Sequence, residues 1–230
     1  MRTIARTSSL IAAGAFVFGA AAGLATPTQP AHGAIETTIL SDWSYDALYG
    51  DWRLTSLMEA SVHAETGERV GWVEDVIFDQ NGVIDTVVVE TKGDMVENGR
   101  FFEVEWDTLV FDSQERAVTL PYTVAQVLDL ETAPTHAAFD SGQERRGEAL
   151  LSMVVNLDGR EPYGRVDDLL MNVVGKVDAY VVEPDGEEGM GYALPYDPNR
   201  IDTSVEHTTL PYTQDKIIEL GRFDYGEMDQ

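Results

Sequence analysis

Pairs of adjacent carboxylates are the side chains in this sequence that come closest to acid–base chemistry. They occur at Glu74-Asp75, Asp167-Asp168 and Glu187-Glu188. Two carboxylates can divide acid and base roles when burial separates their pKa values. The chain contains 41 acidic residues, however, so adjacent acids arise without any catalytic role. We therefore interpret these pairs as solvated or structural, and we expect Asp75 and Asp168 to fix local backbone geometry by accepting amide hydrogen bonds.

Metal ligands and nucleophiles are sparse. The sequence has no cysteine, which excludes disulfides, thiolate nucleophiles and cysteine-based zinc sites. Residues 79–82 (Asp-Gln-Asn-Gly) resemble the start of a calcium loop but lack its third acidic position and its distal glutamate, so a turn explains them better. The four histidines, which have no zinc-helix spacing, are His32, His63, His136 and His207. With no serine elbow or phosphate-binding loop either, we expect no catalytic residue, no metal and no cofactor, and therefore not an enzyme.

The element that organises the chain is a predicted hairpin over residues 70–90. Asn81 and Gly82 lie between two apolar runs, and both residue types tolerate the positive φ of a type I′ turn. The same pattern recurs over residues 163–183, at an offset of 93 residues. The equivalent positions that define this structural motif are Gly71 and Gly164, Asp75 and Asp168, and Gly82 and Gly175.

Later motifs extend the duplication. The run Leu-Pro-Tyr-Thr at 120–123 is repeated without change at 210–213, and residues 102–107 are answered by 192–197, both at an offset of 90 residues. A regular offset across separate motifs indicates an internal repeat. In the second copy Pro195 stands where the first has Glu105. Because proline cannot donate to a ladder, we expect an edge strand or a local irregularity there.

Each copy is typical of a small β-structure that ends in a short helix. In residues 101–106, Phe102, Val104 and Trp106 alternate with acids, which predicts a half-buried strand. Thr123, followed by Gln126, predicts a capping box at the start of the helix. Short strands with closely spaced turns indicate an all-β fold with short helices, and closing each sheet avoids exposed edges. We expect two tandem small β-barrels, over residues 57–130 and 148–221, joined by a linker over 131–147.

The flanking segments differ from the barrels in pattern. In the N-terminal segment, residues 34–56, Tyr45, Leu48, Tyr49 and Trp52 follow the spacing of one helical face. Such an aromatic stripe packs on its own domain or, alternatively, forms an exposed docking surface, since tyrosine and tryptophan anchor interfaces. Tyr45, Tyr49 and Trp52 are therefore candidate interaction residues. Residues 222–230 are assigned to an acidic tail.

Residues 1–33 have the pattern of a signal peptide. Arg2 and Arg6 precede an uncharged run over 10–25, and cleavage is expected after Ala25 or Gly33. The alternative is an uncleaved membrane anchor; in both cases the basic N-terminus directs the body outward, to the periplasm. Cleavage removes two arginines and no acid, which changes the formal charge from −26 to −28. Such a surface repels nucleic acid and anionic lipids, and no later run is long enough to span a membrane.

The motifs together resemble the PRC-barrel family. The residues that carry the resemblance are 68–75 (Glu-Arg-Val-Gly-Trp-Val-Glu-Asp) in the first copy and, less closely, 161–168 in the second. This family is the β-barrel shared by the H subunit of photosynthetic reaction centres and the C-terminal half of the ribosome-maturation factor RimM. The resemblance implies two tandem PRC-type barrels, and it implies a shared scaffold rather than a shared reaction.

The sequence thus favours an exported, non-enzymatic interaction or assembly module with an unknown protein partner in the cell envelope. A role like that of the reaction-centre H subunit is implied by the family, but there the barrel is cytoplasmic, whereas Arg2 and Arg6 predict an outward body. The alternative is an acidic protein that binds divalent cations or serves in salt stress, which calcium would stabilise beyond its ionic strength. An enzyme would need a pocket between the two barrels.

Overall fold

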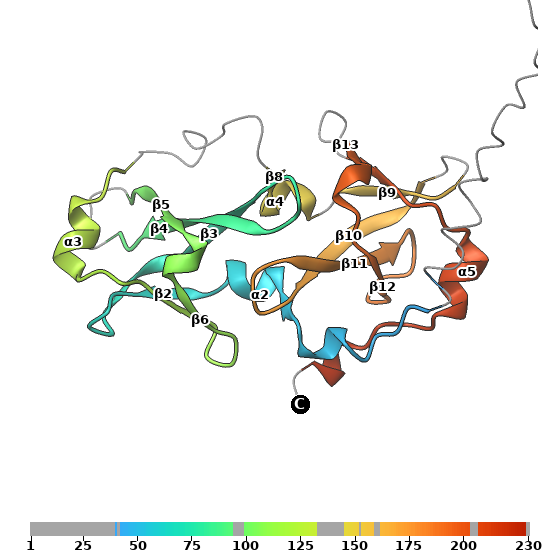
Figure 1. The fold of residues 1–230 in the computed structure, drawn as a ribbon, viewed down its shortest axis with the longest axis horizontal. Helices are drawn as coiled ribbons and strands as arrows, with labels where there is room; N and C mark the ends of the chain where they lie inside the picture. The colour runs from blue at the N-terminus through green and yellow to red at the C-terminus, as the bar shows by residue number, and fades with distance from the viewer. Residues whose placement is uncertain are drawn as a thin grey trace, which may run out of the picture. The chain divides into compact units, whose positions relative to one another are not determined.

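The computed structural model describes residues 40, 42–93, 99–132, 145–151, 153–158, 162–202 and 207–228. The predicted signal peptide and residues 133–144 of the predicted linker lie outside these ranges. The described residues form two seven-stranded sheets with a few short helices (Figure 1). The predicted all-β class, with two barrel-like units, is confirmed. None of the helices in the described ranges is long and apolar enough to cross a membrane.

The first sheet has the strand order β5-β4-β3-β2-β7-β6. Its strands β2 and β7 are parallel, and its other neighbours are antiparallel. The predicted helix follows as α3 (Val124–Asp129), with the Thr123–Gln126 capping box formed. The strands are β2 (Ser61–His63), β3 (Arg69–Phe78), β4 (Ile84–Thr91), β5 (Phe101–Glu105), β6 (Val110–Asp112) and β7 (Ala117–Thr119), with the 3₁₀ turn η2 (Trp106–Thr108) between β5 and β6.

The second sheet repeats this order as β12-β11-β10-β9-β14-β13. The parallel pair is again the equivalent one, β9 with β14. Strand β12, which contains Pro195, pairs with β11 alone among the described strands and so lies at the sheet edge, as expected. The elements are β9 (Val154–Asn156), β10 (Pro162–Met171), β11 (Val177–Pro184), β12 (Tyr192–Pro195), η4 (Pro198–Arg200), β13 (Ile201–Asp202), β14 (His207–Thr209), α5 (Gln214–Glu219) and η5 (Tyr225–Glu227).

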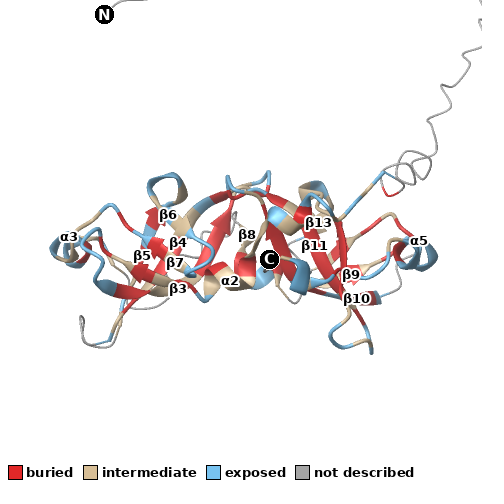
Figure 2. Ribbon diagram, turned by 90° about the horizontal axis from the view of Figure 1, so that it is seen from below, coloured by how far each residue is buried: buried red, intermediate tan, exposed pale blue. Residues whose placement is uncertain are grey.

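The cores follow the alternation in the sequence. In β5, Phe102 and Val104 are buried while Glu103 and Glu105 are exposed. Strands β3 and β10 are buried along most of their length, and α3 and α5 keep an exposed face (Figure 2). One continuous hydrophobic cluster contains buried side chains from both sheets. The two units therefore share this cluster, and a second, smaller cluster packs the second sheet against the N-terminal and C-terminal segments.

The first hairpin turn is longer than the predicted two-residue turn. Gly82 has the expected positive φ of 78°, but Asn81 does not. The reason is Asp79, whose Oδ1 accepts hydrogen bonds from the amides of Asn81 and Val83. This carboxylate organises a five-residue turn between β3 and β4, so the type I′ prediction is wrong in detail although the hairpin is present.

Two additional short strands are exchanged between the units. Strand β1 (Trp52–Arg53), just ahead of the first unit, pairs with β10 of the second sheet. Strand β8 (Arg145–Arg146), just ahead of the second unit, pairs with β3 of the first. Each is followed directly by a short helix, α2 (Leu54–Met58) or α4 (Gly147–Leu150). From the sequence, β1 was expected within the N-terminal segment and β8 within the linker, because a strand of two residues has no periodic pattern that would identify it.

Candidate functional site

The described part of the chain concentrates its buried charge where the two units meet. Asp168 is fully buried and accepts hydrogen bonds from the Arg53 Nε atom and the Thr55 hydroxyl, both at 2.7 Å. Its other oxygen accepts from the backbone amides of Thr55 and Leu169 at 3.1 and 2.9 Å. Asp168 thus joins β10 to β1 and caps the first turn of α2.

Asp75 makes the equivalent arrangement in the first sheet. It is fully buried, and its carboxylate accepts from the Arg146 Nε atom at 2.8 Å. Its Oδ1 atom accepts from the amides of Val76 and Glu148 at 2.8 and 3.0 Å. Asp75 thus joins β3 to β8 and caps α4. The prediction that these two aspartates accept amide hydrogen bonds is confirmed.

A β-bulge turns each aspartate inward. In the pairing of β3 with β4, Val73 and Asp75 oppose successive residues, so that Glu74 is the extra residue. The same shift in β10 leaves Asp167 as the extra residue before Asp168. In these two adjacent acid pairs, one residue is therefore the bulge residue and the other is the buried cap.

The tips of the two hairpins also meet symmetrically. The Ile84 amide donates to the Gly175 carbonyl, and the Val177 amide donates to the Gly82 carbonyl, both at 2.9 Å. A Cβ atom at Gly82 would overlap the Tyr196 ring, and one at Gly175 would lie 2.6 Å from the Trp106 Nε1 atom. Both turn glycines are therefore required by an aromatic ring of the opposite unit as well as by their positive φ.

The other predicted glycines have a local role. A Cβ atom at Gly71 would overlap the carbonyl oxygen of Glu90, and one at Gly164 would overlap that of Glu183. Each glycine therefore lets the two long strands of its hairpin approach closely, as expected of a glycine inside a strand.

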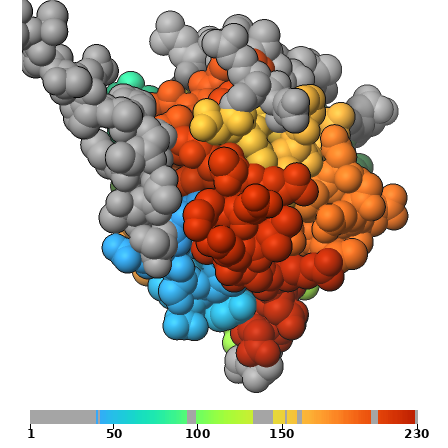
Figure 3. Space-filling model, turned by 90° about the vertical axis from the view of Figure 1, so that its right-hand side faces the viewer, coloured from blue at the N-terminus to red at the C-terminus, as the bar shows by residue number. Residues whose placement is uncertain are grey.

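The aromatic stripe does not form the predicted helical face. Residues 48–50 form a 3₁₀ turn, η1 (Leu48–Gly50), and Trp52 is extended in β1. Tyr45 and Tyr49 both pack on Phe223, with ring centroids 5.4 and 5.2 Å away, so the N-terminal segment lies against the C-terminal one (Figure 3). Trp52 instead contacts the first unit. Tertiary pairing of β1 with β10 overrides the helical spacing here.

The C-terminal residues assigned to an acidic tail contribute to the same packing. Tyr225 donates a hydrogen bond to Asp167 at 2.8 Å, and the Arg53 guanidinium lies 4.0 Å from the Tyr225 ring centroid. Burial raises the pKa of Tyr225, and the charges of Asp168 and Asp167 add to the effect. This segment covers the outer side of the Arg53–Asp168 pair.

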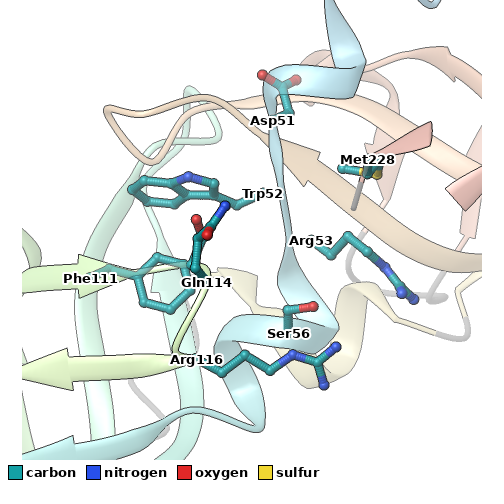
Figure 4. A pocket seen from close by; sticks show the side chains of 9 residues that line it. Asp51, Trp52, Arg53, Ser56, Phe111, Gln114, Arg116 and Met228 are labelled. Carbon is teal, nitrogen blue, oxygen red and sulfur yellow. The ribbon is translucent and has the colours of Figure 1, made fainter. Parts of the chain in front are cut away.

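A pocket opens beside β1. Figure 4 shows Trp52 directed toward Phe111 of β6, whereas the neighbouring Arg53 points the opposite way. Both arginines of the pocket are already paired, Arg53 with Asp168 and Arg116 with Glu59. The lining residues are Asp51, Trp52, Arg53, Ser56, Phe111, Ser113, Gln114, Arg116 and Met228. They include no histidine to act as a base for the two serines.

Asp51 is the one strongly perturbed carboxylate in this pocket's lining. Burial raises its pKa to about 6, and the charge of Asp178 adds to the shift. Its Oδ2 atom is buried and has no hydrogen-bond partner within the described residues. The described residues contain no group of three or more potential metal ligands. Asp51 therefore gives this pocket a carboxylate whose pKa is raised by burial.

Comparison with known families identifies the first unit. Residues 52–127 match the model of the PRC-barrel domain. The match begins at Trp52 and ends in α3, so it includes the exchanged strand β1. It agrees with the resemblance found in the sequence for this unit, whereas the second copy rests on its strand order and equivalent residues. No curated protein matched the chain.

Proposed function

We propose that this chain is an exported, non-enzymatic interaction module of the cell envelope, built from two PRC-type barrels locked into one body. The observation that carries the proposal is the use made of buried charge. Among the described residues, the fully buried carboxylates are Asp75 and Asp168, and both are engaged by an arginine and backbone amides. A catalytic carboxylate needs access to substrate, and these two have none.

The PRC-barrel match supports a scaffold rather than a reaction, since members of such a fold share architecture more than chemistry. The exchanged strands support a rigid body, because each unit completes the sheet of the other. A rigid body with a large acidic surface suits recognition of a partner, with charge increasing the association rate and selectivity.

Fractionation of the native cells tests the export. We expect the mature chain in the periplasmic fraction, and N-terminal sequencing should begin after Ala25 or Gly33. A chain that retains its first residues but is accessible to protease from outside supports the anchored form of the same proposal. An unprocessed chain in the cytoplasm contradicts it.

Affinity capture from the native envelope tests the interaction role, with the tagged mature protein as bait at low and high salt. We expect a single stoichiometric partner that is released as the salt concentration rises, because salt screens the attraction between surface charges. The matched bait is Asp168→Ala, which should weaken the lock between the units and with it the capture. Absence of any partner at either salt contradicts the proposal.

A further inference from the structure

The two units carry equivalent surface grooves beside their hairpin tips. The first groove has a volume of about 620 Å³ and lies on the outer side of β4 and β5. The second has about 300 Å³ and lies beside β11 and η4. Their linings correspond at the repeat offsets: Ile84 with Val177, Asp85 with Asp178, Trp106 with Tyr196, and Val174 with Asn81.

The second groove is supplied with a cation from within the chain. Arg145 donates to the carbonyl of Gln80 at 3.1 Å and to the carbonyl of Pro198, a lining residue, at 2.8 Å. Its charge opposes the burial that raises the pKa of Tyr196, which also lines the groove. Lys176 also lines the groove. Two backbone carbonyls at this groove therefore hold an arginine.

The first groove has the aromatic ring and more acids, but its lining has no cation. The position equivalent to Arg145 is Trp52, which packs on Trp106 with ring centroids 5.8 Å apart. Val83 replaces Lys176. Where the second copy has Ala193 and Pro195, the first has Glu103 and Glu105, and Asp85 and Asp107 complete the acidic lining.

We propose that the first groove binds an arginine side chain from a basic segment of a partner protein. A planar guanidinium suits both an aromatic ring such as Trp106 and carboxylates such as Glu105 and Asp107. The apolar stem of the arginine would lie on Val174, which is 63% exposed. The molecule already uses this chemistry at Arg53, which lies over the Tyr225 ring and pairs with Asp168. The inference rests on the proposed function, because it names the partner chemistry of the interaction module.

Titration of the full-length protein with a capped Gly-Arg-Gly-Arg-Gly peptide tests the proposal, followed by calorimetry and by tryptophan fluorescence. We expect saturable binding with one site, a fluorescence change from Trp106, and weakening as salt rises. The matched peptide with citrulline in place of arginine keeps the shape and loses the charge, so it should not bind. Equal binding of the citrulline peptide, or stronger binding of spermidine than of the arginine peptide, overturns the proposal.

Two double variants with the same charge change locate the site. Glu105→Gln with Asp107→Asn removes two exposed carboxylates of the groove and should weaken peptide binding about tenfold or more. Glu65→Gln with Glu68→Gln removes two exposed acids in the turn before β3 and should leave binding within about twofold. Equal losses in the two variants overturn the proposal, because binding would then be diffuse. Unchanged urea midpoints show that both variants fold.

The same groove variant, used as bait for capture, separates this inference from the proposed function. Loss of the partner together with loss of the peptide supports both. A partner captured equally by wild type and groove variant overturns the arginine site and leaves the interaction role intact.

Discussion

The two units of this chain match at their buried aspartates and hairpin tips, and they differ at their outer grooves. Asp75 and Asp168 make matching contacts with Arg146 and Arg53, and both turn glycines meet an aromatic ring of the opposite unit. At the grooves, by contrast, the first copy has Trp52 at the position where the second copy has Arg145. A duplication keeps what both copies need to fold together, and under our proposal it is free to diverge where only one copy binds a partner.

The largest expected effect comes from removing either of the two buried aspartates, Asp75 and Asp168, whose contacts match in the two units. Asp75→Ala and Asp168→Ala should each lower the free energy of unfolding by about 3–5 kcal/mol, because each removes the buried carboxylate that accepts from a partly buried arginine and from a helix terminus. Urea unfolding of the full chain measures this. Asp129→Ala, at an exposed position in α3, is the control and should change stability by less than about 0.5 kcal/mol. Markedly unequal losses of unfolding free energy in the two variants would contradict the equivalence of the two aspartates.

The hairpin tips give the next effect. Gly82→Ala and Gly175→Ala impose a positive φ on alanine and overlap Tyr196 and Trp106, so each should cost about 2–4 kcal/mol. Gly186→Ala has a similar φ of 84° with open space around it, and should cost only about 1 kcal/mol. The excess over Gly186→Ala, measured by urea unfolding, is the contribution of the contact between units. Equal losses at all three positions would show that this contact contributes nothing.

Much of the fold of each unit could be predicted from the sequence because it depends on local patterns. The hairpins, the duplication, the Thr123 capping box and the edge position of Pro195 each rest on residues close together in the chain. The exchange of β1 and β8 could not be predicted. Arg53 bonds to Asp168, which lies 115 positions later in the sequence. A strand of two residues has no periodic pattern from which its partner could be predicted.

The candidate site shows the same limit. Tyr45, Tyr49 and Trp52 have helical spacing, but Tyr45 and Tyr49 pack on Phe223 while Trp52 contacts the other unit. The first groove was not predicted from the sequence, because one of its lining residues, Val174, comes from the hairpin tip of the second unit. One signal was present in the sequence: aligning the copies sets Trp52 against Arg145 and Glu105 against Pro195, and these are the substitutions that distinguish the grooves.

A smaller effect should follow from removing the internal cation of the second groove. Arg145→Ala deletes two hydrogen bonds to backbone carbonyls and should cost about 1–2 kcal/mol in urea unfolding. Arg145→Ala combined with Lys176→Val, which removes both cations of the second groove, should also raise the number of arginine-peptide sites from one to two, with the second weaker because Ala193 and Pro195 supply no carboxylate. Arg116→Ala, which breaks an exposed pair with Glu59, is the control and should have little effect on either measurement. A peptide stoichiometry that stays at one would contradict the equivalence of the grooves.

The smallest effect concerns Asp51, where the N-terminal segment faces Asp178 of the second unit. Burial raises the pKa of Asp51 from 3.8 to about 6 in the folded protein, so between these values the folded chain holds a proton that the unfolded chain has lost. Stability therefore falls as pH rises through this window, and the loss is complete above the folded pKa. The variant Asp51→Asn should not show this loss of stability.

Because Asp51 is only partly buried, solvent screening limits the expected gain of Asp51→Asn above pH 6 to about 1 kcal/mol. Urea midpoints of wild type and variant, measured from below to above this window, should coincide at its acid end and separate as pH rises. Asp46→Asn, an exposed aspartate in the same segment, should follow wild type throughout. Parallel curves for wild type and Asp51→Asn would contradict the raised pKa of Asp51 in the folded chain.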